Sequence, residues 1–166
     1  MAVFIHAPQD FRNLCAVART LDVLGERECH VYDPYRLIRD RYGKARSRMQ
    51  RDISSGAFDA IRWVRVEEPL SFLRQSSQRL VATVAEAGAS CSLAEFGFSP
   101  SDLLIFGSES RGLPAELVDL CASSITIPSL GKTQSLNLAV AFGVVLFEWH
   151  RQTRASSQVA EPARRG

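Results

Sequence analysis

Residues 2–34 read AVFIHAPQDFRNLCAVARTLDVLGERECHVYDP, and this stretch decides the fold. The apolar run at 2–6 predicts a buried strand. Apolar residues then recur at helical spacing from Asn13 to Gly25, and this glycine has the residue type of a helix C-cap. Residues 30–34 predict a second strand, which the final proline stops. A strand, a helix and a strand in this order predict two parallel strands joined by a crossover.

The same alternation continues along the chain. Predicted strands follow at 61–66, 80–84, 102–106 and 125–128, and predicted helices at 69–76, 117–121 and 135–153. This pattern predicts an α/β fold, with a parallel sheet flanked by helices on both faces. We expect a single domain over residues 1–153 and a disordered polar tail at 154–166. Ligands bind at the carboxyl ends of parallel strands, so the loops after Val84, Phe106 and Ile127 are the candidate sites.

Composition excludes several classes of protein. The chain has 166 residues, of which 46% are hydrophobic and 23% charged, as in an ordinary globular domain. Its 20 Lys and Arg against 18 Asp and Glu give a net charge of +2, which excludes a histone-like chain. Its longest apolar stretch is shorter than the roughly 20 residues of a membrane span, and no secretory signal opens the sequence, so we expect a cytoplasmic protein without membrane association. The cysteines form no CxxC pair and the histidines show no ligand spacing, so no metal site is expected.

Positive charge is concentrated in one segment. Residues 36–51 contain seven Lys or Arg against Asp40 alone, a local excess of 7 − 1 = +6. On its own, such a segment is most often a solvated loop. If the chain binds RNA, the same cations become candidates for phosphate contacts.

Two loops in the C-terminal half carry distinctive residues. The first reads FGSESRGLP at 106–114 and holds Glu109 and Arg111 between Gly107 and Gly112. Two glycines permit positive φ and a close approach of the backbone to a ligand. Leu113 follows Gly112 at the position where a Walker loop has lysine, which excludes a Walker phosphate loop at these residues. An ordinary strand–turn–helix connection with solvated charges remains the alternative.

The second loop reads IPSLGKTQSLNLAVA at 127–141. Ser135 has the residue type of an N-cap for the helix that follows. Asn137 is a poor helix former that we expect in the first turn, where its amide can face a ligand at the positive end of the helix dipole. Near the N-terminus, Asn13 can cap the first helix, and Arg19 lies almost two turns beyond it. Taken alone, that arginine predicts only a solvated side chain.

In this order, the three stretches resemble motifs of the SPOUT class of RNA methyltransferases and, within it, of the SpoU/TrmH family of 2′-O-ribose methyltransferases. FGSESRGLP matches the FGxExxGLP loop of that family, and IPSLGKTQSLNLAVA matches its IPxxGxxxSLNxSxA element. Leu146-Phe-Glu148 matches the helix ending LYE. The resemblance covers about residues 3–153. A Rossmann-type methyltransferase would instead need a glycine-rich fingerprint, and the sequence contains no GxG.

The first motif departs from the family pattern NxGNxxxxxR. Asp10 stands in place of its first asparagine, and Arg12 in place of its glycine. Asn13 and Arg19 keep the spacing of the remaining two positions. The departure therefore leaves the catalytic residues in place and bears on the shape of the substrate loop.

The resemblance implies a parallel sheet whose C-terminal part forms a deep trefoil knot. It also implies that the knot loops bind S-adenosylmethionine as cofactor, and that the protein is a homodimer with a shared site. By motif, the implied cofactor-binding residues are Thr83, Val84, Gly107, Glu109, Gly112, Ile127, Leu136 and Asn137. The implied catalytic residues are Arg19, Asn13, Glu109, Asn137 and Ser135. The candidate RNA-binding residues are Arg46, Arg48, Arg51 and Arg111.

The implied reaction moves a methyl group to a ribose 2′-oxygen of RNA and needs no metal. A guanidinium titrates above about 12 and is no free base, so we expect Arg19 to grip the adjacent phosphate and polarise the hydroxyl. We expect a tRNA substrate, with the wobble ribose favoured over a D-loop guanosine, because the chain begins directly with its first strand, as the smallest members do. Ribosomal RNA methylation by the same chemistry and RNA binding without catalysis are the alternatives.

Overall fold

The computed structural model describes residues 2–38, 50–85 and 89–158, with side chains up to residue 154. Within these residues the sheet has seven strands in the order β3-β2-β1-β6-β4-β7-β5, and all neighbouring strands are parallel. The strands are β1 (Ala2–His6), β2 (Glu28–Tyr32), β3 (Arg62–Arg65), β4 (Arg79–Thr83), β5 (Cys91–Ser92), β6 (Asp102–Phe106) and β7 (Ser123–Thr126). The helices are α1 (Phe11–Val23), α3 (Ala57–Ala60), α4 (Pro69–Arg74), α5 (Ala115–Val118) and α6 (Leu138–Gln158). The predicted parallel α/β fold is confirmed.

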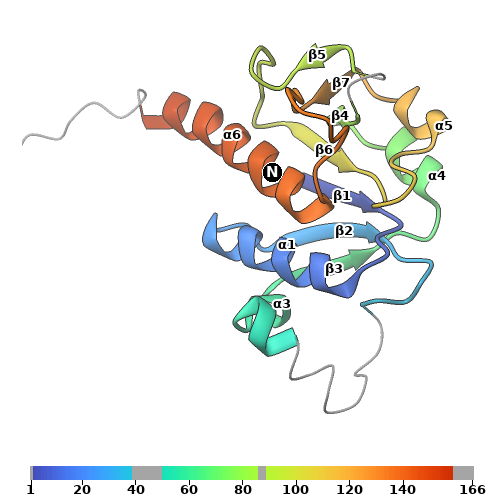
Figure 1. Ribbon diagram of the computed structural model, residues 1–166, viewed down its shortest axis with the longest axis vertical. Coiled ribbons are helices and arrows are strands. Elements are labelled where there is room, and N and C mark those ends of the chain that lie inside the picture. The colour runs from blue at the N-terminus through green and yellow to red at the C-terminus, as the bar shows by residue number, and fades with distance from the viewer. Residues whose placement is uncertain (1, 39–49, 86–88, 159–166) are drawn as a thin grey trace, which may run out of the picture.

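Helices cover both faces of the sheet (Figure 1). Val3 and Ile5 of β1 pack in the core beneath α1, α3 and α6, whereas Phe4 between them packs in the core beneath α4 and α5. All five residues of the central strand β6 are buried. Two-sided burial of this kind explains why the strands read as continuous apolar runs in the sequence. No helix in the described part of the chain is long and apolar enough to cross a membrane.

The first helix begins at Phe11, two residues earlier than predicted. Its N-cap is Asp10, whose carboxylate accepts a hydrogen bond from the backbone N–H of Arg12 at 2.8 Å. The same carboxylate pairs with the Arg12 guanidinium at 2.7 Å, and this hydrogen-bonded pair lowers the pKa of Asp10. Asn13 therefore lies inside the first turn and does not cap the helix. The two residues that depart from the family motif thus form the cap together.

The last helix also differs from its prediction. It begins at Leu138, and its cap is Asn137, whose side-chain oxygen accepts a hydrogen bond from the backbone N–H of Ala139 at 2.9 Å. Ser135 lies before this cap and does not have the predicted capping role. At its other end α6 continues to Gln158, so residues 154–158 of the predicted tail are helical. The rest of that tail, 159–166, lies outside the described residues.

Three short elements escape the prediction. β5 has only two residues and pairs with β7 at the edge of the sheet, where the sequence predicts a loop. α3 and a helical turn at residues 50–54 lie between β2 and β3. Elements of four or five residues show too little periodicity to be distinguished from loops by pattern alone.

A buried ion pair joins the starts of β4 and β6. The carboxylate of Asp102 is fully buried, and it receives two hydrogen bonds from the Arg79 guanidinium, at 2.6 Å and 2.8 Å. Arg79 also donates to the carbonyl of Gly97 at 2.8 Å, and the backbone N–H of Ser99 donates to Asp102 at 2.7 Å. Both oxygens of the buried carboxylate thus have hydrogen-bond partners, which its burial requires. The pair fixes the amino ends of two strands whose carboxyl ends carry the site described below.

Replacing Arg79 by Met should destabilise the fold strongly. The variant keeps the apolar stem but leaves the buried charge of Asp102 without its partner, so we expect a loss of about 3–5 kcal/mol of unfolding free energy. Urea denaturation followed by circular dichroism measures the change, at one fixed protein concentration. Arg62→Met is the matched control, because Arg62 pairs with Glu28 at 3.0 Å on the exposed surface. Its loss should be below about 1 kcal/mol, and an equal loss in both variants would contradict the prediction.

Candidate functional site

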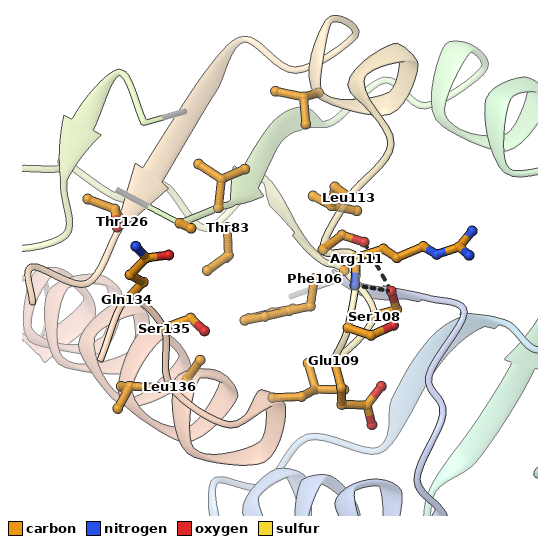
Figure 2. A pocket seen from close by; sticks show the side chains of 18 of the residues that line it. Thr83, Phe106, Ser108, Glu109, Arg111, Leu113, Thr126, Gln134, Ser135 and Leu136 are labelled. Carbon is orange, nitrogen blue, oxygen red and sulfur yellow. Dashed lines mark hydrogen bonds between the residues drawn. The ribbon is translucent and has the colours of Figure 1, made fainter. Parts of the chain in front are cut away.

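A pocket of about 580 Å³ opens at the carboxyl ends of β4, β6 and β7. It lies where the sequence predicts a ligand site, between the loops that follow these three strands. Figure 2 shows Gln134 and Ser135 on one side of the cavity and Phe106 and Ser108 on the other. The lining includes all but one of the residues implied as cofactor-binding, namely Thr83, Val84, Gly107, Glu109, Gly112, Ile127 and Leu136. Asn137 is the exception.

The loop after β6 is a tight turn that only glycines permit. Ser108 and Gly112 exchange two backbone hydrogen bonds of 3.0 Å each, which close the turn. Gly112 has φ +64°, in the left-handed region. A Cβ on Gly107 would lie 2.1 Å from the carbonyl carbon of Gly112. The backbone on both sides of this turn therefore borders the pocket directly.

Three of the implied catalytic residues form a hydrogen-bonded chain beside the pocket. Asn137 donates from its side-chain amide to the side-chain oxygen of Asn13 at 3.0 Å. Asn13 donates to the Glu109 carboxylate at 2.7 Å, and that carboxylate also accepts the backbone N–H groups of Gln9 at 2.8 Å and Asp10 at 3.1 Å. In Figure 2 the Glu109 carboxylate is turned away from the cavity, toward α1. These hydrogen bonds thus join the starts of α1 and α6 to the loop after β6.

The donors and acceptors in these hydrogen bonds follow from the groups at the two ends, Glu109 and Asn137. At one end the Glu109 carboxylate accepts only, so Asn13 must turn its NH2 group toward it. At the other end the oxygen of Asn137 is occupied by the backbone N–H of Ala139, so its NH2 group must face Asn13. Both amide orientations are therefore determined by chemistry. Asn137 and Asn13 act here by holding elements together, which the sequence patterns did not indicate.

One polar atom in the pocket wall lacks a partner. The hydroxyl of Thr83 is buried and makes no hydrogen bond to any described residue. Apolar side chains surround the same space, among them Leu113, Val118 and Leu138. A buried hydroxyl without a partner is costly unless a ligand or water satisfies it. The pocket therefore suits a ligand with both an apolar surface and hydrogen-bonding groups.

Arg19 lies away from the pocket of its own chain. It is exposed and lines a second hollow of about 590 Å³, formed by α1, α6 and the helical turn before α3. That hollow is mostly apolar, with Val23 and Phe147 at its wall. The structure thus brings together Asn13, Glu109 and Asn137, places Ser135 in the pocket wall, and leaves Arg19 apart from all four.

The candidate RNA-binding residues have different surroundings. Arg111 is exposed at the pocket, and its guanidinium points away from the cavity in Figure 2. Arg51 is exposed on the helical turn at 50–54. Arg46 and Arg48 lie outside the described residues. The described part of the chain contains no group of three His, Cys, Asp or Glu side chains that could hold a metal ion.

Sequence reasoning missed three participants, one side chain and two backbone N–H groups. Gln134 lines the pocket next to Ser135, and its amide can reach a ligand, although the sequence offers only its position in the loop as a signal. The backbone N–H groups of Gln9 and Asp10 bind Glu109, and no side-chain pattern reveals such a contact.

Comparison with known proteins agrees with the geometry. The SpoU rRNA Methylase family matches residues 1–147 of the chain. The chain belongs to this family. The family also implies the C-terminal knot, which stays a prediction here.

Relatives of this SpoU family member are named for more than one position in tRNA. It is 30% identical to the tRNA (guanosine(18)-2′-O)-methyltransferase of Thermus thermophilus, over 89% of this chain and 71% of that protein. A structure described as giving insights into 2′-OH methylation of C/U34 on tRNA superposes with a TM-score of 0.75 at 31% identity, over 91% of this chain and 94% of that one. The SpoU methyltransferase AviRb of Streptomyces viridochromogenes was solved in complex with the cofactor AdoMet. It superposes with a TM-score of 0.75 at 26% identity, over 94% of this chain and 61% of that one.

Gly107→Ala should abolish ligand binding in the pocket. The added Cβ cannot fit 2.1 Å from the carbonyl carbon of Gly112, so the turn must open and move the pocket wall. We expect that calorimetry detects no binding of S-adenosylmethionine to this variant. Gly97→Ala is the control, because nothing lies within 4 Å of its added Cβ. Wild-type affinity in Gly107→Ala would show that the pocket is not the binding site.

Proposed function

We propose that the protein transfers the methyl group of S-adenosylmethionine to a ribose 2′-oxygen of RNA. The observation that carries this proposal is the pocket between the loops after β4, β6 and β7. Side-chain hydrogen bonds that run from Asn137 through Asn13 to Glu109 border this pocket. The named activities of the relatives in the same family support it.

Residues of the pocket fit this cofactor. The backbone at Gly107 and Gly112 can bind its polar groups at close range, and the unpartnered hydroxyl of Thr83 can bond to it. Ile127 and Leu136 supply apolar contact for its adenosine. When bound, S-adenosylmethionine supplies an electrophilic methyl group on a sulfonium.

The residues of this chain must align the ribose and help remove the proton of its hydroxyl. Arg19 binds the phosphate next to the target ribose through its planar guanidinium and polarises the 2′-hydroxyl of that ribose. A phosphate oxygen or water then takes the proton, because the guanidinium stays charged. Ser135 and Glu109 line the pocket and are placed to orient the reacting groups.

The active form is a homodimer in which Arg19 serves the pocket of the other subunit. Val140, Val144 and Phe147 form an exposed apolar stripe on α6, at 40–61% exposure. Such a stripe at helical spacing is typical of an interface. Phe147 and Arg19 line the same hollow, so a second copy seated on the stripe approaches Arg19.

The substrate is tRNA, with the wobble nucleotide favoured over the D-loop guanosine. This chain covers 94% of the protein in the structure concerned with C/U34, whereas it covers 71% of the guanosine-18 enzyme from Thermus. A ribosomal substrate is the second candidate. The 23S rRNA (adenosine(1067)-2′-O)-methyltransferase of Streptomyces azureus is 38% identical over 84 residues, which are 49% of this chain and 30% of that protein.

Labelled S-adenosylmethionine and unmodified total tRNA provide the first test. We expect label in tRNA at a single 2′-O-methylated nucleotide, located at the wobble position by mass spectrometry of nuclease fragments. Label at guanosine 18 would replace the wobble assignment, and label only in ribosomal RNA would replace tRNA as substrate. Cofactor binding with no transfer to either RNA would favour RNA binding without catalysis.

A mixture of two inactive variants tests the shared site. Arg19→Ala lacks the phosphate grip and Gly107→Ala lacks the pocket, so each homodimer should be inactive. If the site is shared, mixed dimers contain one fully intact site, and complete subunit exchange should restore about a quarter of wild-type activity. Methyl transfer to tRNA is measured before and after exchange. If Arg19 served its own pocket, no mixed dimer would contain an intact site and activity would stay absent.

A further inference from the structure

The loop after β2 is held rigidly by one buried side chain. Asp33 is 1% exposed, and its two carboxylate oxygens accept the backbone N–H groups of Leu37 and Ile38 at 2.8 Å each. Its carbonyl oxygen accepts the backbone N–H of Arg36 at 3.2 Å. A carboxylate that binds two backbone N–H groups fixes the chain between them.

This rigid loop presents an aromatic ring and a cation to solvent. Tyr35 is 56% exposed, although it directly follows a well-packed strand and turn. Arg36 is exposed and has φ +56°, a left-handed conformation that costs about 1 kcal/mol for a residue other than glycine. No carboxylate among the described residues forms an ion pair with it. Stability of the fold explains neither the exposed ring nor the strained cation.

Hydrogen bonds connect this loop to the pocket. The backbone N–H of Ala7 donates to the carbonyl of Tyr32 at 2.9 Å, which ties the loop after β1 to the end of β2. Two residues further on, Gln9 and Asp10 bind the Glu109 carboxylate at the pocket. The strands β2 and β6 flank β1, so their ends lie about 10 Å apart. Tyr35 lies three residues beyond one of these ends and Glu109 three residues beyond the other, so the two are separated by the length of a few stacked nucleotides at about 3.4 Å each.

We propose that Tyr35 and Arg36 bind the RNA substrate beside the methylated nucleotide. The Tyr35 ring stacks on an unpaired base a few nucleotides away, and Arg36 pairs with a phosphate of the same strand. Proteins recognise single-stranded RNA by this combination of aromatic stacking and adjacent positive charge. The inference rests on the proposed function, since it specifies how the RNA is held.

Two variants of Tyr35 separate stacking from bulk. Tyr35→Leu keeps apolar volume but removes the ring, and should raise the KM for tRNA roughly fivefold or more. Tyr35→Phe keeps the ring and should behave like the wild type. The kcat, the affinity for S-adenosylmethionine and the melting temperature should stay unchanged in both. A wild-type KM for tRNA in Tyr35→Leu, or a changed oligomeric state, would overturn the proposal.

Arg36→Asn tests the phosphate contact. Asparagine tolerates the left-handed conformation, so the substitution removes the charge with little strain. The slope of log affinity for tRNA against log salt should fall by about one unit. Arg62→Gln is the control. Arg62 is exposed at the amino end of β3, whereas Arg36 lies beyond the carboxyl end of β2, so this variant should leave the slope unchanged. Equal slopes in wild type and Arg36→Asn would refute the contact.

An abasic substitution in the RNA identifies the stacked base. Removing that base should raise the KM of the wild type as Tyr35→Leu does, and should have no further effect on Tyr35→Leu. Additive effects at every abasic position near the target would exclude stacking by Tyr35. If the wild type methylates the RNA but no abasic position shows a non-additive effect with Tyr35→Leu, this inference alone is refuted. If the wild type transfers no methyl group to any RNA, the proposed function is refuted.

Discussion

The site depends on the carboxylate of Glu109 and the three N–H groups that converge on it. Two of these come from the backbone of the loop after β1 and the third from Asn13 in the first turn of α1. An ionised carboxylate only accepts hydrogen bonds, so it satisfies backbone donors that no strand or helix pairs. The pocket loop can remain at the surface and still keep its shape, because this exposed carboxylate fastens it to the loop after β1 and to the buried Asn13 of α1.

The same physical device recurs one loop further along the sheet edge. Asp33 fastens the loop after β2 through two backbone N–H groups, as Glu109 fastens the loop after β1. Loops at the carboxyl ends of parallel strands are rich in unpaired N–H groups, and acidic side chains are their natural partners. Each carboxylate keeps its negative charge but turns its oxygens toward N–H donors of neighbouring loops. The edge that carries the pocket thus gains loops of fixed shape from two acidic side chains.

The sequence allowed the fold and the place of the pocket to be predicted, for reasons that are local. Apolar runs and helical spacing determine the strands, and parallel strands expose their loops at one edge, so Gly107, Ile127 and Leu136 lie where expected. The roles of Asn13 and Asn137 were not predictable, because each depends on a partner about a hundred residues away. The cap formed by Asp10 was missed because the apolar spacing placed the start of the helix at Asn13. Tyr35 gave no signal, since an exposed ring matters only once Asp33 is known to hold it in place.

The separation of Arg19 from the pocket follows from helix geometry. Six residues along α1 place Arg19 about 9 Å from Asn13 along the axis, and rotate its side chain by roughly 120° to another face. Asn13 uses its face to bind Glu109, and the apolar face of α1 is buried in the core with residues of α3 and α6, so the helix cannot turn to bring Arg19 inward. Within one chain Arg19 therefore lines the second hollow and not the pocket. On the proposed chemistry, assembly of two copies is then a requirement of catalysis and not an addition to it.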